Sequence, residues 1–172
     1  MAIEVISEFI AKATVRTIAY IYDDDGELTD PATGGSIKVS IWDPNGVQKA
    51  GYISVVASTS FTAGLVVTGA ISGAKGVVIS KPDETTLELQ QVTGIWQDDE
   101  GITDADSGTS TTTSALLGAD MTKQNAVTGV YEYYYQTTSD SEKGWWRGEV
   151  DVIDGTGEDA KTSIGNFPFR VR

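Results

Sequence analysis

The tyrosine-rich segment 128–137, with the sequence TGVYEYYYQT, is the feature that most limits how this chain folds. Successive side chains of a β-strand point to opposite faces, so Tyr131, Tyr133 and Tyr135 share one face of an extended segment. Aromatic residues favour such a pleated, half-buried surface. The segment therefore predicts a strand with one aromatic face, and the remaining elements are interpreted around it.

Further strands are predicted on both sides of the tyrosine segment. Residues 14–22 form an apolar, β-branched run that ends at a charged turn closing on Gly26. Residues 36–42 alternate, with Ile37, Val39 and Ile41 on one face, which indicates a strand buried on one side. The Asp-Pro-Asn-Gly sequence at 43–46 predicts a tight turn, so 47–57 should return as the next strand.

The C-terminal part of the sequence predicts a hairpin and a final edge strand. Residues 139–144 are polar, and 145–153 place Trp146, Gly148, Val150 and Val152 on one face, so we expect this strand to pair with the tyrosine strand. The last predicted strand is 164–171. Pro168 lies within it and cannot donate a ladder hydrogen bond, which predicts a place at the edge of a sheet.

The N-terminal segment 4–13 is compatible with two structures. Ile6, Phe9, Ile10 and Ala13 fit one face of a helix, whereas the β-branched content also fits an extended arm. Both alternatives remain open at this point.

A repeat lies in the middle of the chain. At an offset of 35 residues, two segments align on matching apolar, threonine, serine and glycine positions: Phe61 with Trp96, Val67 with Ile102, Thr68 with Thr103, Ala70 with Ala105, Ser72 with Ser107 and Gly73 with Gly108. Residues 76–80 and 85–89 form a hairpin pattern between the copies. Neither copy is long enough to bury an apolar face alone, which predicts that 57–113 closes into a barrel-like insert between 1–56 and 114–172.

Charge and composition exclude several functional classes. The chain has 12 basic and 25 acidic residues, a formal net charge of −13, so nucleic acid is not an expected partner. It contains no histidine and no cysteine, which removes the residues used in most hydrolytic triads and in disulfides. The first twenty residues carry Glu4, Glu8, Lys12 and Arg16, so we expect neither a signal peptide nor a membrane span, and we expect synthesis in the cytoplasm.

Three short motifs could carry chemistry, and each has a plainer interpretation. Gly155-x-Gly157-x-x-Ala160 imitates a dinucleotide fingerprint, but only twelve residues follow it, so a loop is expected. The acidic cluster at 23–30 could bind calcium, but it lacks the EF-hand spacing, so a solvated turn is expected. The acids at 98–100 could serve a glycosidase only across a cleft. We predict no catalytic residue, no cofactor and no metal.

Two parts of the sequence resemble known viral β modules. The segment 22–46, with Asp25-Gly26, Leu28-Thr29-Asp30-Pro31 and Asp43-Pro44-Asn45-Gly46, followed by Thr128-Gly129-Val130-Tyr131, resembles the immunoglobulin-like domains of tailed-phage virion proteins. Its Gly-x-Tyr-x-Tyr core places Tyr131 at the tyrosine-corner position and Tyr133 where such domains carry cysteine. The middle segment is similar to the short Ser-Gly-rich β repeats of phage head and tail proteins, although Asp99 and Asp104 replace Gly64 and Gly69.

The resemblance implies an all-β protein: an immunoglobulin-like antiparallel β-sandwich with an inserted β subdomain. It also implies a non-enzymatic virion component, a head decoration or tail protein that assembles with capsid or tail subunits in multiple copies. The alternative is a carbohydrate-binding or adhesion module that uses exposed tryptophans on a surface glycan. The predicted contact residues are aromatic: Phe9, Trp96, Trp145, Phe167 and Phe169.

Overall fold

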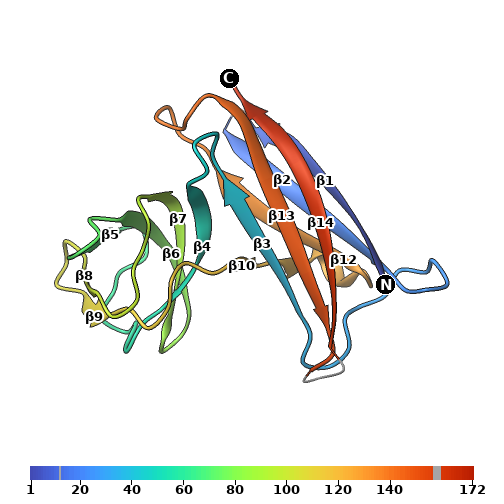
Figure 1. The fold of residues 1–172 in the computed structure, drawn as a ribbon, viewed down its shortest axis with the longest axis horizontal. Helices are drawn as coiled ribbons and strands as arrows, with labels where there is room; N and C mark the ends of the chain where they lie inside the picture. Colours follow the sequence, from blue (N-terminus) through green and yellow to red (C-terminus); the bar gives the residue numbers. More distant parts are fainter. Residues whose placement is uncertain (12, 157–159) are drawn as a thin grey trace. The chain divides into compact units, whose positions relative to one another are not determined.

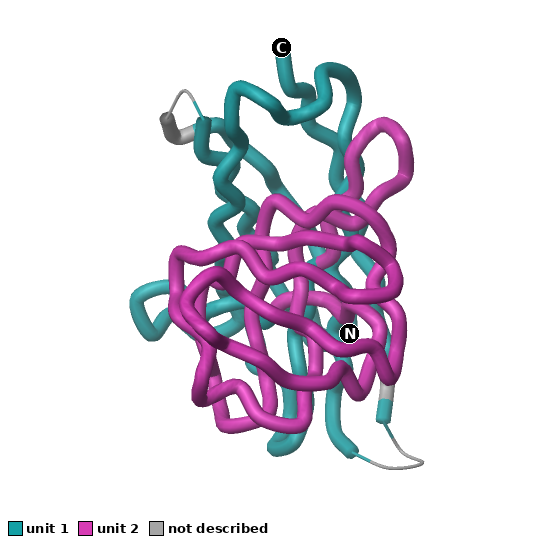
Figure 2. Tube along the Cα trace, turned by 90° about the vertical axis from the view of Figure 1, so that its left-hand side faces the viewer, with its two compact units in different colours: residues 1–39, 120–172 teal, residues 40–119 magenta. Residues whose placement is uncertain are grey.

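The protein is an all-β molecule made of two compact units. The computed structural model describes residues 1–11, 13–156 and 160–172. Unit 1 consists of residues 1–39 and 120–172, and unit 2 of residues 40–119 (Figures 1 and 2). All strand pairs given below are antiparallel, and the only helix among the described residues is the 3-10 turn η1 (Gln124–Ala126). The predicted all-β class is confirmed.

One sheet of unit 1 contains the tyrosine strand. Its order is β1 (Ala2–Ala11), β2 (Thr14–Tyr22), β12 (Val130–Gln136) and β11 (Thr122–Lys123). The N-terminal segment, which fitted either a helix or an arm in sequence, is strand β1 and pairs with β2 from Ala2↔Tyr22 to Ala11↔Thr14. Pairing with β2 satisfies the backbone N–H and C=O groups of this segment, and it therefore decides for the extended structure over the helix.

The second group of strands in unit 1 corrects one sequence prediction. β13 (Gly144–Asp154) pairs with β14 (Lys161–Val171), not with the tyrosine strand β12, which pairs with β2 instead. The expected hairpin was wrong because β13 joins the opposite layer, beside β3 (Ser36–Trp42). β14 ends the strand order, so the edge position predicted from Pro168 is confirmed.

The core of unit 1 forms where its two layers meet, with β1, β2 and β12 behind β13 and β14 in Figure 1. Tyr135 of β12 lies 5.6 Å from Trp146 of β13, and Trp146 lies 5.6 Å from Phe169 of β14, measured between ring centroids. The predicted alternation of β13 is confirmed, since Trp146, Val150 and Val152 are buried. Two antiparallel layers joined by aromatic packing give unit 1 the arrangement of a β-sandwich.

Unit 2 is built from short strands. In hydrogen-bonded order, its strands are β4 (Gln48–Ser54), β7 (Thr86–Thr93), β6 (Lys75–Asp83), β5 (Val66–Gly69), β8 (Gly101–Thr103) and β9 (Thr109–Thr111). The hairpin predicted around the Lys81–Glu84 turn is present as β6 and β7. The segment 57–113 lies inside unit 2, which also includes β4 because β4 pairs with β7.

The sequence repeat corresponds to a repeated arrangement in unit 2. Phe61 and Trp96 occupy aligned positions, as do Val67 and Ile102, and all four are buried in one core cluster. The copies also pair directly, with Thr68 opposite Thr103. Gly64 and its counterpart Asp99 both have positive φ, 89° and 57°, so the aspartate preserves the local backbone despite the substitution.

A five-residue aspartate turn occurs three times among the residues that the structure describes. Asp23, Asp43 and Asp104 each accept two backbone N–H groups through Oδ1, from the residues two and four positions later, at 2.6–3.0 Å. The fourth residue of each turn has positive φ: 84° at Gly26, 82° at Gly46 and 75° at Ser107. These side-chain bonds hold the turns in fixed conformations.

Candidate functional site

A groove of about 660 Å³ lies at one end of unit 1. It is lined by residues 7–9 near the end of β1, by Ala13 just before β2, by residues 137–139 after β12, and by Trp145 with residues 168–172 from the ends of β13 and β14. Antiparallel pairing brings these segments to the same end, because Gln136 stands opposite Thr14 beside the β1–β2 turn and Gly144 stands opposite Val171. The volume falls in the range of roughly 300–1,000 Å³ common to ligand pockets.

Exposed aromatic side chains form the apolar wall of the groove. Trp145 is 65% exposed, and the Arg170 guanidinium lies over its ring, 6.0 Å from the centroid. Phe9 is 44% exposed and packs edge-on against Phe169, with the ring centroids 6.2 Å apart. The Arg170–Trp145 geometry is that of a cation–π contact, which holds the arginine at the groove.

Hydrogen bonds fix the loop that forms the rim. The buried Trp146 donates its indole N–H to the carbonyl oxygen of Glu142 at 2.8 Å. Thr137 donates both its backbone N–H and its hydroxyl to the carbonyl oxygen of Ala13, at 2.7 and 2.8 Å. Ser7 donates its hydroxyl to the Pro168 carbonyl at 3.1 Å, which ties β1 to the edge strand. The groove is therefore held by the fold at several points.

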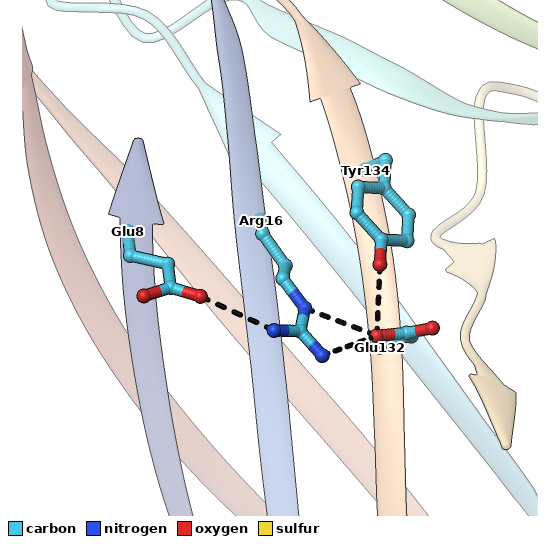
Figure 3. A network of polar contacts seen from close by, with 4 residues as sticks. All are labelled: Glu8, Arg16, Glu132 and Tyr134. Atoms are coloured by element: carbon cyan, nitrogen blue, oxygen red, sulfur yellow. Dashed lines mark hydrogen bonds and ion pairs between the residues drawn. The ribbon is translucent and has the colours of Figure 1, made fainter. Parts of the chain in front are cut away.

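A polar network holds the Glu8 carboxylate beside the groove. Arg16 donates from Nη1 to Glu8 at 3.3 Å, and from Nε and Nη2 to Glu132 at 3.0 and 2.7 Å (Figure 3). Tyr134 donates its hydroxyl to the same Glu132 oxygen at 3.0 Å. The hydrogen bond to Glu132 raises the pKa of Arg16, so the guanidinium stays charged and partly neutralises Glu8.

The structure brings three of the five predicted contact residues to the groove and buries the other two. Phe9, Trp145 and Phe169 line it, although Phe169 is only 5% exposed. Phe167 is buried against Gly148, its partner in the β13–β14 register. Trp96 is buried in the unit 2 core beside a smaller hollow of about 280 Å³.

The acidic side chains considered as possible metal or catalytic groups hold the local structure instead. Asp23 caps its own turn, and no group of three or more acidic side chains suited to a metal is found in the described part of the chain. Glu100 is fully buried and accepts hydrogen bonds from Gln97, Ile71 and Ser72. Gly157 of the Gly-x-Gly motif lies outside the described residues.

Sequence reasoning missed the polar half of the groove. The hydroxyls of Ser7, Thr138 and Ser139 and the guanidinium of Arg170 lie beside the aromatic side chains. The only signal in the sequence was the pair of arginines near the end of an acidic chain, Arg170 and Arg172. Together these groups offer an aromatic face, hydroxyls and positive charge, a combination that suits binding through stacking and hydrogen bonds.

Comparisons of this chain with protein families, with curated proteins and with solved structures find no match. Among the described residues, no helix is long and apolar enough to cross a membrane.

Proposed function

We propose that this chain is a non-enzymatic structural protein of a tailed virus particle, present in multiple copies as a head decoration or a tail component. In this proposal 1–56 and 114–172 form an immunoglobulin-like sandwich, 57–113 is the inserted Ser-Gly-rich β module, and both act through protein–protein contacts. The partners are other virion proteins, capsid or tail subunits. The resemblance of segments 22–46 and 128–131 to phage virion domains motivates this proposal.

The observation that carries the proposal is the exposure of Trp145 on strand β13. Its side chain is 65% exposed although Trp146, the next residue, is buried, so β13 presents one indole outward while the other fixes the strand in the core. Large aromatic residues held in this way are typical anchors of protein interfaces. Phe9 adds a second exposed aromatic ring to the same groove.

Incorporation into particles tests the proposal. Virus particles assembled with Trp145→Ala should contain on the order of tenfold fewer copies of the protein than wild-type particles, because loss of an interface anchor typically costs more than about 1 kcal/mol. Mass spectrometry of purified particles measures the copy number. Ile164→Ala is the matched control, since Ile164 is 54% exposed on β14 but does not line the groove. A protein absent from wild-type particles would contradict the proposal.

Deletion of residues 1–12 does not provide this test, because these residues include strand β1 of the unit 1 sheet. β1 pairs with β2 along its length, and Val5 and Ile3 approach Gly165 of β14. Removing β1 would expose β2 and the buried side of β14. A loss of incorporation would then follow from unfolding alone, so single surface substitutions are needed.

A carbohydrate-binding module is the second candidate, and the groove supplies a specific observation for it. Trp145 is 65% exposed and lines the same groove as Ser7 and Thr138, whose side chains carry hydroxyls, and aromatic rings stack on the apolar faces of sugars. A glycan array followed by tryptophan-fluorescence titration separates the two functions. Saturable binding that is lost in Trp145→Ala would support the carbohydrate module, whereas the virion proposal expects no saturable response.

A further inference from the structure

The two ends of unit 1 carry different charged groups. The groove lies where β1 ends and where β13 begins, opposite Val171. The other end holds the turn after β2, where Ala2 stands opposite Tyr22 and Asp154 opposite Lys161. In Figure 1 the chain termini mark these two ends, with N beside the turn and C at the end of β14. The strands therefore separate the groove from the β2 turn by the length of the sandwich.

The turn after β2 is an exposed acidic loop with a fixed shape. Asp24, Asp25 and Glu27 are exposed, and Leu28 at the end of the loop is 38% exposed. Asp23 holds the loop by accepting the N–H groups of Asp25 and Glu27 at 2.9 and 3.0 Å. A loop that is already ordered loses little conformational entropy when it binds.

The groove end holds most of the arginines of an acidic chain, and the adjoining loop also carries Asp140, Glu142 and Lys143. Three of the four arginines in the sequence, Arg147, Arg170 and Arg172, lie near the start of β13 or the end of β14. Arg170 and Arg172 line the groove itself, and Glu8, the one acidic side chain among its described lining residues, is bound by Arg16. The groove therefore presents guanidinium groups to a ligand, while its acidic side chain is already paired.

The acidic loop and the groove are complementary in charge and in apolar content. Asp25 and Glu27 match Arg170 and Arg172, and the partly exposed Leu28 matches the aromatic wall of the groove. The groove and the loop lie at opposite ends of unit 1, so one copy cannot join them within itself. A second copy can supply the loop, which makes the contact head-to-tail.

We infer that the groove binds the 23–28 loop of a second copy of this chain, so that successive copies associate head-to-tail through unit 1. This inference rests on the proposed function as a multi-copy structural protein and names one of its partners. Complementary charge steers such encounters and favours the correct register. Screening by salt should weaken the contact, because the charges are at the surface.

Charge reversal in the full-length protein tests the inference. Sedimentation velocity over a concentration series should show reversible self-association of the wild type. Arg170→Glu with Arg172→Glu, or Asp25→Lys with Glu27→Lys, should raise the Kd on the order of tenfold or more, because each places like charges opposite one another. All four substitutions in one chain restore opposite charges and should restore association.

Two control variants and the particle assay give the outcomes that decide the inference. Lys75→Glu and Glu84→Lys change exposed charges in unit 2 and should leave association unchanged. A wild type that stays monomeric would overturn the inference. A fourfold variant that associates as weakly as the two double variants would also overturn it. So would a wild-type groove that binds glycans and loses that binding in the arginine variants. If the inference fails but the protein is present in particles at normal copy number, the proposed function still stands. Absence of the wild type from particles would contradict the proposed function, whatever the result of the self-association experiment.

Discussion

Tyr131 donates its phenolic O–H to Oδ1 of Asp30 at 2.9 Å, across 101 positions of the sequence. The same oxygen accepts the backbone N–H of Gly129 at 2.9 Å, and the other carboxylate oxygen accepts from Lys123. Asp30 therefore fixes the start of β12 against the segment that follows β2. The hydrogen bonds from Gly129 and Lys123 lower the pKa of Asp30, so it remains a carboxylate at neutral pH.

Tyr131→Phe should lower the free energy of unfolding by about 1.5–3 kcal/mol, the range for a lost hydrogen bond to a charged group. Urea denaturation at pH 7 measures the change. Tyr134→Phe is the control and should cost less, since Tyr134 is 43% exposed and its partner Glu132 keeps its bonds from Arg16. An equal loss in both variants would contradict a specific role for Tyr131.

The Tyr131 hydroxyl also predicts a change in stability at alkaline pH. Burial, followed by the hydrogen bond to Asp30, raises the pKa of Tyr131 to about 12. The folded pKa lies above the unfolded value of about 10, so the stabilisation is complete below a pH of about 10 and is lost as the pH rises through about 12. Between these two pKa values the stability of Tyr131→Phe should fall less steeply with pH than that of the wild type, as measured by urea unfolding. Parallel pH dependences would exclude this linkage.

Local pattern was sufficient to predict most strands but not their partners. β2 begins and ends where the apolar, β-branched run predicted, β3 where the alternation of apolar residues predicted, and β13 buries the predicted face. The pairing of β13 with β14 could not be obtained in this way, because a polar loop such as 139–144 can join two strands of one sheet or two strands of opposite layers. Partner choice depends on long-range packing, here that of Trp146 between Tyr135 and Phe169.

The candidate groove was predictable only in its aromatic part. Phe9 and Trp145 were identified as contact residues from residue type, and the structure places both in the groove. Phe167 belongs to the same class, but it is buried because its ring covers Gly148 across the β13–β14 pair. Exposure depends on the face and on the opposite residue, so residue type alone does not distinguish an anchor from a core residue.

Glu100→Gln should destabilise the protein by about 3 kcal/mol, because the amide places an N–H₂ donor where the buried carboxylate oxygens only accept hydrogen bonds. Burial raises the pKa of Glu100, but hydrogen bonds from Gln97 and Ser72 outweigh it, and the net pKa lies below the ordinary value. The stabilisation is therefore present above the unfolded pKa and is lost as the pH falls through the folded pKa. Thermal melts at pH 7 and in acid measure both effects, with the exposed Glu84→Gln as the control. A Glu100→Gln variant that melts as the wild type does at both pH values would refute this role.

Gly46→Ala should cost about 1–2 kcal/mol through backbone strain alone. Gly46 has φ of 82°, and an added Cβ would meet no atom within 4 Å, so a steric clash contributes nothing. Gly46→Asn should cost less, because asparagine tolerates the left-handed region. Denaturant unfolding of the two variants compares them directly, and an alanine variant as stable as the asparagine variant would contradict the strain argument.

Gly148→Ala should destabilise unit 1 by about 1–3 kcal/mol, the usual cost of overpacking a core. An added Cβ would lie 1.9 Å from Cζ of Phe167, whose ring is 3% exposed and stacked 6.3 Å from Phe169, so it has little room to move. Gly101→Ala is the matched control in a strand, since its Cβ would meet only Ala70 at 3.9 Å. Combining Gly148→Ala with Phe167→Leu removes the clash, so the double variant should be more stable than the sum of the single changes predicts, as measured by a double-mutant cycle. Additive effects would show that the ring moves aside freely and that Gly148 is not required by this contact.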